Sequence, residues 1–256
     1  MSVTETGAAE ALPLLVAPDR SPGTDTGASA LRWDNEETLD LRLPPEFTAL
    51  RAALPGQAAP SRDADLLDGL RTWGPTATPA GTFELIPVRP DRDLPLIHGW
   101  MNDPQVAEYW ELAGTPDLTE RHLRAQLDGD GRSVPCLGML DGTAMSYWEI
   151  YRADLDPLAR LYRARPHDTG IHLLIGDAAH RGRGLGSALL TAVAELVMEH
   201  RRTCTRVVAE PDMRNTPSVI AFRNAGFQCR AEVELPGKRA ALMIRDRVRP
   251  EPRSTT

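Results

Sequence analysis

The sequence predicts an α/β fold in which helices flank a mixed central sheet. Three observations support this prediction. From Phe83 onward, short runs with strand patterns alternate with longer runs of helical pattern. Asp141-Gly142 separates two strand-like runs, which is a strong signal for an antiparallel hairpin. Residues 168–200 and 206–226 each read as a strand followed by a helix, which predicts a parallel pair at the centre of the sheet.

The elements follow in order from this pattern. Strands are expected at 83–89, 133–140, 143–151, 168–176, 206–211, 227–235 and 238–247. Helices are expected at 93–101, 104–110, 119–127, 187–200 and 215–226. Thr119 is the expected cap of the third of these helices, Gly226 ends the last one, and Pro236-Gly237 turns the final hairpin. The sequence contains no internal repeat.

The domain organisation follows from a change in composition near residue 80. Residues 1–80 are expected to form a partly disordered N-terminal extension, rich in small residues and proline at its start. Weak strand and helix patterns appear between residues 31 and 75, and the stretch GPTATPAGT is expected to be a linker. Residues 81–248 would form the main domain, and 249–256 a disordered tail.

Composition excludes several classes of function. The chain of 256 residues has 41% hydrophobic and 25% charged residues, which is ordinary for a soluble globular protein. It contains neither a membrane-length apolar run nor a signal-peptide pattern. The net charge of −7 argues against a nucleic-acid partner. Three cysteines without metal-ligand spacing predict reduced thiols, no metal site and a cytoplasmic location, whereas the oligomeric state is left open.

The run from His180 to Ser187 has the features of a phosphate-binding turn. It lies between a strand and a helix, where free backbone N–H groups and the helix dipole favour an anion. It matches neither the P-loop nor the G-x-G-x-x-G dinucleotide pattern. It reads R-x-x-G-x-G at Arg181, Gly184 and Gly186, which resembles the pyrophosphate loop of the GNAT N-acetyltransferase superfamily.

This resemblance covers about residues 80–247 and implies the GNAT fold, whose central parallel pair splays apart. It implies acetyl-CoA or another acyl-CoA as co-substrate. In that family, backbone N–H groups of the splayed strand, here those of Leu174 and Ile175, polarise the thioester carbonyl. An Asn at the place of Asn215 contacts coenzyme A, although Asn215 also suits a helix N-cap. The implied pyrophosphate-loop residues are Arg181, Gly182, Arg183, Gly184, Leu185 and Gly186.

A second set of motifs narrows the resemblance. The pattern H-x-W-M-N-x-P-x-V-x-x-x-W from His98 to Trp110, the run YWEIY from Tyr147 to Tyr151, and VAEPDMRN resemble siderophore-biosynthesis acyltransferases. Those enzymes acylate N-hydroxylated lysine, ornithine or cadaverine, so a small-molecule acceptor is implied. The candidate acceptor-binding residues are His98, Trp100, Asn102, Trp110, Glu149 and Tyr151, of which Glu149 is suited to pair with a substrate ammonium.

His172 is the candidate general base, because imidazole titrates near neutral pH and His172 lies on the strand that would polarise the thioester. Asp212, after the neighbouring strand, would orient the imidazole or share its proton, unless it serves only as a turn residue. Phe222 stands where many GNAT enzymes place a tyrosine that protonates the leaving thiolate. The other histidines, His122 among them, are expected on the surface.

Three functions remain open from the sequence. The first is an acyl-CoA-dependent N-acyltransferase that makes a hydroxamate in siderophore biosynthesis. The second is an aminoglycoside 6′-N-acetyltransferase, which acidic residues around the acceptor would favour. The third is a non-catalytic GNAT-like module that binds coenzyme A, for which Phe222 is the motive.

Overall fold

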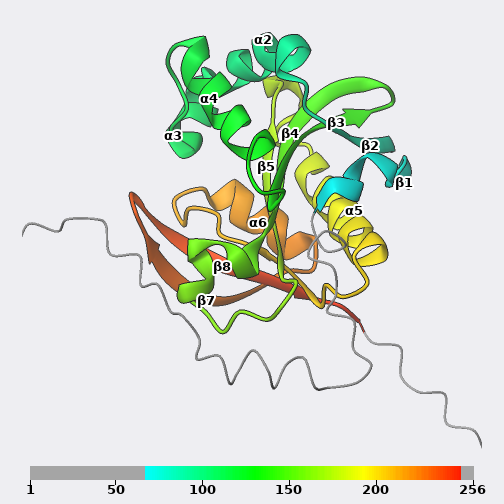
Figure 1. Cartoon of the computed structure of the whole chain (residues 1–256), viewed down its shortest axis with the longest axis vertical. Helices are drawn as coiled ribbons and strands as arrows, with labels where there is room; N and C mark the ends of the chain where they lie inside the picture. The colour runs from blue at the N-terminus through cyan, green and yellow to red at the C-terminus, as the bar shows by residue number, and fades with distance from the viewer. Residues whose placement is uncertain (1–66, 249–256) are drawn as a thin grey trace, which may run out of the picture. The chain divides into compact units, whose positions relative to one another are not determined.

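The computed structural model describes residues 67–248, which form one eight-stranded mixed sheet with helices on both faces (Figure 1). The strand order is β1-β2-β3-β4-β5-β6-β8-β7. All neighbours are antiparallel except β5 and β6. The strands are β1 (Thr76–Thr78), β2 (Gly81–Pro87), β3 (Ser133–Leu140), β4 (Thr143–Arg152), β5 (Thr169–Ile175), β6 (Arg206–Ala209), β7 (Gln228–Leu235) and β8 (Lys238–Asp246).

The parallel pair β5–β6 separates soon after it begins. The two strands pair only at Thr169 with Val207 and at Gly170 with Val208. Strand β6 ends at Ala209, and Pro211 has no N–H with which to continue the ladder. The rest of β5, up to Ile175, therefore borders a gap in the sheet, and the expected splayed pair is confirmed.

Helices cover the two faces of the sheet. The α-helices are α2 (Pro90–Met101), α3 (Pro104–Trp110), α4 (Pro116–Leu127), α5 (Leu185–His200) and α6 (Thr216–Asn224). Short 3₁₀ turns are η2 (Leu67–Thr72), η3 (Ala153–Leu155), η4 (Pro157–Arg160) and η5 (Ala178–His180). Figure 1 shows α2, α3 and α4 grouped together at one end of the described residues. Helix α4 begins at Pro116 with Thr115 as N-cap, so the expected cap at Thr119 is wrong; Thr119 is buried within the helix.

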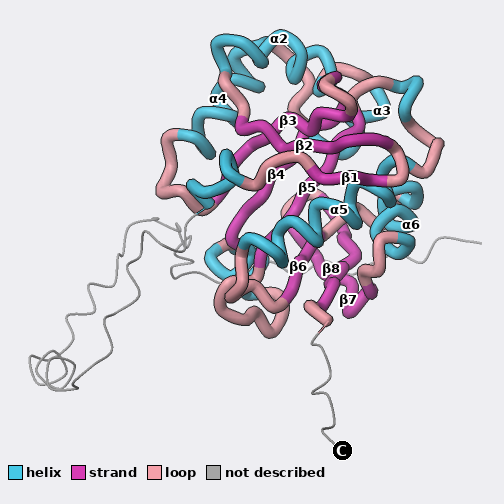
Figure 2. Tube along the Cα trace, turned by 90° about the vertical axis from the view of Figure 1, so that its right-hand side faces the viewer, coloured by secondary structure: helices cyan, strands magenta, loops and turns pink. Residues whose placement is uncertain are grey.

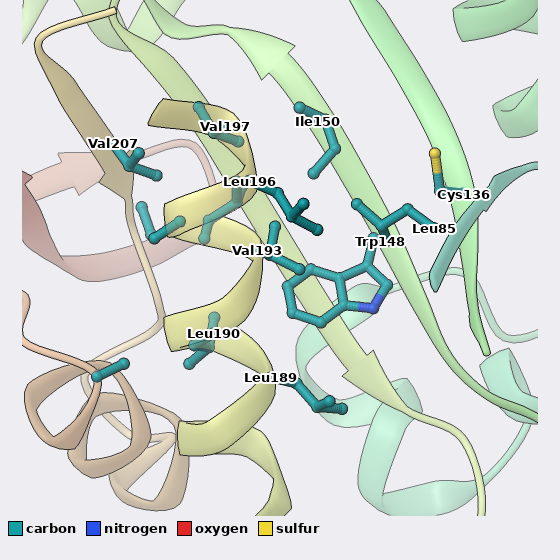
Figure 3. Close-up of a cluster of buried hydrophobic side chains, with 14 of the residues drawn as sticks. Leu85, Cys136, Trp148, Ile150, Leu189, Leu190, Val193, Leu196, Val197 and Val207 are labelled. Carbon is teal, nitrogen blue, oxygen red and sulfur yellow. The ribbon is translucent and has the colours of Figure 1, made fainter. Parts of the chain in front are cut away.

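The alternation of side chains along β4 separates two cores. Trp148 and Ile150 face α5, whose buried leucines and valines complete the larger cluster (Figure 3). Tyr147 faces the other way and packs with α2, α3 and α4 through residues such as Ile97 and Leu123. Figure 2 shows α5 lying in front of the strands. Each face of β4 therefore packs against a different layer of helices. This packing determines on which face the polar side chains of β4 lie.

The ordered domain begins before residue 81. Leu67, Leu70 and Trp73 are buried in the same core as α5, and β1 pairs with β2 in place of the expected linker. The first 66 residues of the extension, with the disorder and the weak patterns expected there, and the tail expected at 249–256 lie outside the described residues. Within residues 67–248, no helix is both long and apolar enough to cross a membrane.

Candidate active site

The gap between β5 and β6 opens into a cavity of about 420 Å³. Its walls come from the C-terminal end of α3, from α4, from β5, from the segment after β6, from α6 and from the start of β8. His172 and Leu173 of β5 line one wall, and Phe222 of α6 lines another. The cavity is of the size that ligand-binding pockets in proteins usually have.

His172 is held between two carboxylates. Its Nδ1 lies 2.8 Å from Oε2 of Glu149, and its Nε2 lies 2.5 Å from Oε1 of Glu210. Glu149 is directly opposite His172 on β4, and Glu210 follows the end of β6. Both carboxylate side chains are more than nine-tenths buried, whereas the His172 side chain is 33% exposed. The imidazole is therefore the most accessible of the three groups, although both carboxylates also line the cavity.

Further donors hold both carboxylates in place. The Tyr151 hydroxyl donates to Oε2 of Glu210 at 2.7 Å. Oε1 of Glu149 accepts from the Tyr147 hydroxyl at 2.9 Å and from the Gln126 side-chain amide at 2.8 Å. His122 Nε2 lies 2.5 Å from the same Glu149 oxygen. Every oxygen of the two buried carboxylates therefore has at least one partner, as buried charges require.

These contacts shift the proton affinities of the three central groups. Burial alone would lower the pKa of His172, but the two carboxylates outweigh it and raise that pKa to about 10. Burial would raise the pKa values of Glu149 and Glu210. Hydrogen bonds from His122 and His172 instead lower the pKa of Glu149, and the His172 charge lowers that of Glu210. His172 is therefore protonated near neutral pH, between two ionised carboxylates.

Asp212 does not take the place expected for it beside His172. Its carboxylate binds the Arg214 guanidinium at 2.7 Å and accepts from the Arg214 backbone N–H at 2.8 Å. This is the turn arrangement that the sequence left as the alternative. The carboxylate on His172 is instead that of Glu210, two residues earlier, whose side chain points to β5.

The backbone of β5 offers N–H groups to the gap. Gly176 N–H donates to the Met145 carbonyl at 2.9 Å, and the β4–β5 register pairs Leu174 with Tyr147. Because N–H groups alternate in direction along an antiparallel strand, that of Leu174 points to β4 and those of Leu173 and Ile175 point to the gap. Of the expected pair of donors, Leu174 and Ile175, only Ile175 therefore directs its N–H to the gap, and Leu173 is the other residue of β5 that does so.

The glycine-rich loop has room for an anion above the start of α5. Gly182 and Gly184 have φ angles of 70° and 78°, which other residues rarely adopt, and a Cβ built on either meets no atom within 4 Å. The first backbone donor of α5 is Ala188, whose N–H binds the Gly184 carbonyl at 3.3 Å. The N–H groups of Leu185 and Gly186 are thus free for a ligand. This geometry fits the pyrophosphate of coenzyme A.

The two arginines of that loop have different surroundings. Arg181 forms an ion pair with Asp103 at 3.0 Å and donates to the Ile175 carbonyl at 2.9 Å and to that of Gly176 at 2.6 Å. It therefore ties the loop to the start of α3, where Asp103 is the N-cap. Arg183 is exposed. Of the two, Arg183 is the one whose charge is available to an incoming anion.

Helix α6 brings two further predicted residues to the cavity. Asn215 caps the helix by accepting from Ser218 N–H at 3.1 Å, and it also lines the cavity. Phe222 is buried against Phe227 and faces the cavity without any group that donates a proton.

Among the six predicted acceptor-binding residues, Trp110 and Glu149 line the cavity. The Trp110 ring makes an edge contact with the His172 ring at 6.1 Å between centroids. Tyr151 supports Glu210 from behind. The others have structural contacts: Asn102 bonds to the His98 ring at 3.0 Å and accepts from Gly114, and Trp100 packs on Gly176.

Sequence reasoning missed Glu210, His122 and Lys238, which also line the cavity. Glu210 belongs to the run VAEPDMRN, but the direction of its side chain depends on where β6 ends. His122 was expected on the surface, and only the fold brings it to Glu149. No group of side chains in residues 67–248 has the arrangement of a metal site.

A sheet with a splayed parallel pair, a glycine-rich loop before a helix and a histidine at the gap define an acyltransferase of the GNAT type. The acetyltransferase (GNAT) domain family matches residues 89–235, and the chain belongs to this family. It is therefore an N-acyltransferase enzyme.

The chain is 35% identical over 207 residues to lysine N-acyltransferase MbtK of Mycobacterium sp. (strain MCS), covering 81% of this chain and 79% of that protein. It is 31% identical to N(6)-hydroxylysine O-acetyltransferase of Escherichia coli, covering 62% of this chain but 50% of the relative.

Two solved structures resemble the fold. An uncharacterized protein from Bacillus halodurans is 34% identical, with a TM-score of 0.64, covering 68% of this chain and 89% of that one. Aminoglycoside acetyltransferase AAC(6′)-Ib in complex with coenzyme A and kanamycin is 26% identical, with a TM-score of 0.58, covering 64% of this chain and 95% of that one.

Proposed function

We propose that this protein transfers an acyl group from acetyl-CoA or another acyl-CoA to the nitrogen of an N-hydroxylated amine. The acceptor is of the lysine, ornithine or cadaverine type, and the product is a hydroxamate for siderophore biosynthesis. The observation that carries the proposal is His172, held between Glu149 and Glu210 at the gap in the sheet. The names of the relatives support the class of acceptor. The reaction takes place in the cytoplasm, where acyl-CoA is available.

Acyl-CoA supplies the thioester, and the glycine-rich loop and Asn215 are placed to hold its pyrophosphate and pantetheine ends. The N–H groups of Leu173 and Ile175 stabilise the negative charge that develops on the carbonyl oxygen during attack. In other enzymes, a mutation that removes one such donor lowers kcat by a factor of about 10²–10³. Backbone donors suit this purpose because the strand holds them rigid.

The acceptor explains why a protonated histidine suits this site. A hydroxylamine nitrogen is less basic than an ordinary amine, so it arrives neutral and needs no base before attack. As the N–C bond forms, the nitrogen becomes acidic and passes its proton to Glu210. Glu210 can accept this proton despite its low pKa, because the nitrogen that has just formed the N–C bond is positively charged and therefore acidic.

The same pair serves the leaving group. As the C–S bond breaks, His172 gives its Nε2 proton to the thiolate sulfur and recovers a proton from Glu210 across their 2.5 Å contact. One proton leaves the nitrogen and one reaches the sulfur, so the site returns to its starting charge. This route uses His172 as the acid that Phe222 cannot be.

An aminoglycoside acceptor is the second candidate, because AAC(6′)-Ib has a similar fold and four acidic residues line the cavity. Three of these are already paired: Glu149 and Glu210 with His172, and Asp212 with Arg214. Lys238 adds a positive charge to the same cavity. A polycationic aminoglycoside would therefore find little unpaired negative charge in the cavity. This favours an N-hydroxylated amine as the acceptor.

The test offers five acceptors to the enzyme: N6-hydroxylysine, N5-hydroxyornithine, N-hydroxycadaverine, lysine and kanamycin. Each is assayed with acetyl-, succinyl- and longer acyl-CoAs as donors, and the release of free thiol measures the rate. We expect a hydroxylamine to be preferred over its parent amine and over kanamycin. Glu210→Gln should reduce kcat, whereas Glu120→Gln, on the exposed side of α4, should leave it unchanged. A preference for kanamycin would contradict the proposed function.

A further inference from the structure

Lys238 is the only lysine in a chain whose other cationic side chains, histidine apart, are all arginine. It begins β8 and lines the cavity. Its Nζ donates to the backbone carbonyl of Glu210 at 3.0 Å, which fixes the ammonium at the cavity wall. Among residues 67–248, no carboxylate forms an ion pair with it. An ammonium with one neutral partner retains two N–H groups for a ligand.

The other positive charges around the cavity are occupied. The charged His172 lies between its two carboxylates. The other histidine of the cavity wall, His122, is hydrogen-bonded to Glu149. Arg214, which is not itself a lining residue, is paired with the lining residue Asp212. Lys238 is therefore the cation of the cavity wall that is available to an anionic group.

One negative charge on the same wall is also unpaired within the described residues. Glu111 caps the C-terminus of α3 in the left-handed conformation, with φ 54°, and is exposed. Its carboxylate lies over the turn before β8: a Cβ placed on Gly237 would be 3.7 Å from Oε1 of Glu111. Gly237 directly precedes Lys238, so an unpaired carboxylate and an unpaired ammonium lie at one end of the cavity.

We propose that these two residues bind the amino-acid end of the acceptor, Lys238 its α-carboxylate and Glu111 its α-ammonium. The inference rests on the proposed function and narrows it to an N-hydroxylated α-amino acid, in preference to an N-hydroxylated diamine. Glu210 connects the two ends, because its carboxylate meets His172 and its carbonyl meets Lys238. One residue therefore contacts both the imidazole, where the hydroxylamine nitrogen would react, and the ammonium, where the α-carboxylate would bind.

The experiment uses three acceptors of one chain length. N6-hydroxylysine has both end groups, N-hydroxycadaverine has the ammonium alone, and 6-(hydroxyamino)hexanoate has the carboxylate alone. With the full chain and acetyl-CoA, we expect kcat/KM to fall on the order of 10- to 100-fold when either end group is missing, the usual effect of one charged hydrogen bond.

Variants then assign each group to its residue. Lys238→Met should remove the preference for N6-hydroxylysine over N-hydroxycadaverine, and Lys238→Arg should restore part of it. Glu111→Gln should remove the preference for N6-hydroxylysine over 6-(hydroxyamino)hexanoate. Arg239→Met is the matched control, because Arg239 is exposed next to Lys238 and pairs with Glu232. Ratios between acceptors are the readout, since a general disturbance of Glu210 would slow all three equally.

Equal kcat/KM for the three acceptors in the wild type, or an equal loss for all three in Lys238→Met, would overturn the subsite. If none of the hydroxylamines is acylated, the proposed function fails. Calorimetric binding of the same three compounds in the presence of coenzyme A then decides the subsite separately. Tighter binding of N6-hydroxylysine that depends on Lys238 would support it, and equal binding would refute it.

Discussion

The phenol ring of Tyr151 lies on the backbone of Gly170, its partner across the β4–β5 ladder. A Cβ on Gly170 would overlap with the ring atoms. The contact places the Tyr151 hydroxyl 2.7 Å from Glu210 and the ring 4.9 Å from that of His172, centroid to centroid. The position of the reactive pair therefore depends on a residue without a side chain.

Gly170→Ala should displace Tyr151 and lower kcat more than Tyr151→Phe, which removes the hydroxyl but keeps the ring. We expect a loss of stability of about 1–3 kcal/mol from overpacking, measured by urea unfolding. Gly99→Ala is the control, because a Cβ there meets no atom within 4 Å. Unchanged kcat in Gly170→Ala would show that Tyr151 does not position Glu210.

Glu210→Gln and Asp212→Asn separate the two carboxylates after β6. If Glu210 exchanges protons with substrate and His172, Glu210→Gln should lower kcat by about 10²–10⁴. Asp212→Asn should mainly lower the melting temperature, because Asp212 holds a turn through Arg214. Steady-state kinetics and thermal melting of both variants test this. A larger loss of kcat in Asp212→Asn would restore Asp212 as the catalytic carboxylate.

The raised pKa of His172 predicts a pH dependence of stability. A group whose pKa is raised on folding stabilises the fold fully below its unfolded value of 6.5, and this contribution disappears as the pH rises through about 10. The difference in unfolding free energy between the wild type and His172→Gln should therefore shrink as the pH rises from about 6.5 to about 10. Imidazole NMR should show His172 still protonated at pH 8. Titration near pH 6.5 would contradict the ion-paired geometry.

His122 should stabilise the fold through Glu149 at neutral pH. A carboxylate whose pKa is lowered on folding contributes above its unfolded value of 4.5, and the contribution is lost as the pH falls through the lowered pKa. His122→Ala should cost about 1–3 kcal/mol at pH 7 and progressively less below pH 4.5. Arg121→Ala removes a charge from the neighbouring exposed position and serves as control. A loss independent of pH would indicate packing alone.

Arg181 and Arg183 should behave differently although both belong to the glycine-rich loop. Arg181→Gln breaks the contacts to Asp103, Ile175 and Gly176, so it should lower the melting temperature without ligand. Arg183→Gln should leave that temperature unchanged and raise the dissociation constant of coenzyme A, with a weaker salt dependence. Calorimetry and melting curves measure both. Equal effects of the two variants on both quantities would contradict this division.

The sequence predicts most of the fold because its alternating pattern and glycine turns are local signals, and every expected strand from Phe83 onward is present. It does not predict β1, whose three residues belong to the sheet only through pairing with β2. It also misplaces the start of α4, because Pro116 continues the helix towards its N-terminus.

The candidate site is predicted in part. His172 and Glu149 are identified by type and strand position, and the register of β4 and β5 brings them together. The sequence pattern does not distinguish Glu210 from Asp212, because the direction of each side chain depends on β6 ending at Ala209. The sequence also does not predict the ion pair between Arg181 and Asp103, because the two residues lie far apart in sequence and only folding brings them together.

The cavity at the gap has a kinetic consequence. It reaches from Phe222 on α6 to Trp110 on α3 as one space, so donor and acceptor can be present together. We therefore predict that both substrates bind before the acyl group passes directly from one to the other. Initial-velocity lines at varied concentrations of both substrates should intersect, whereas parallel lines are the signature of a ping-pong mechanism.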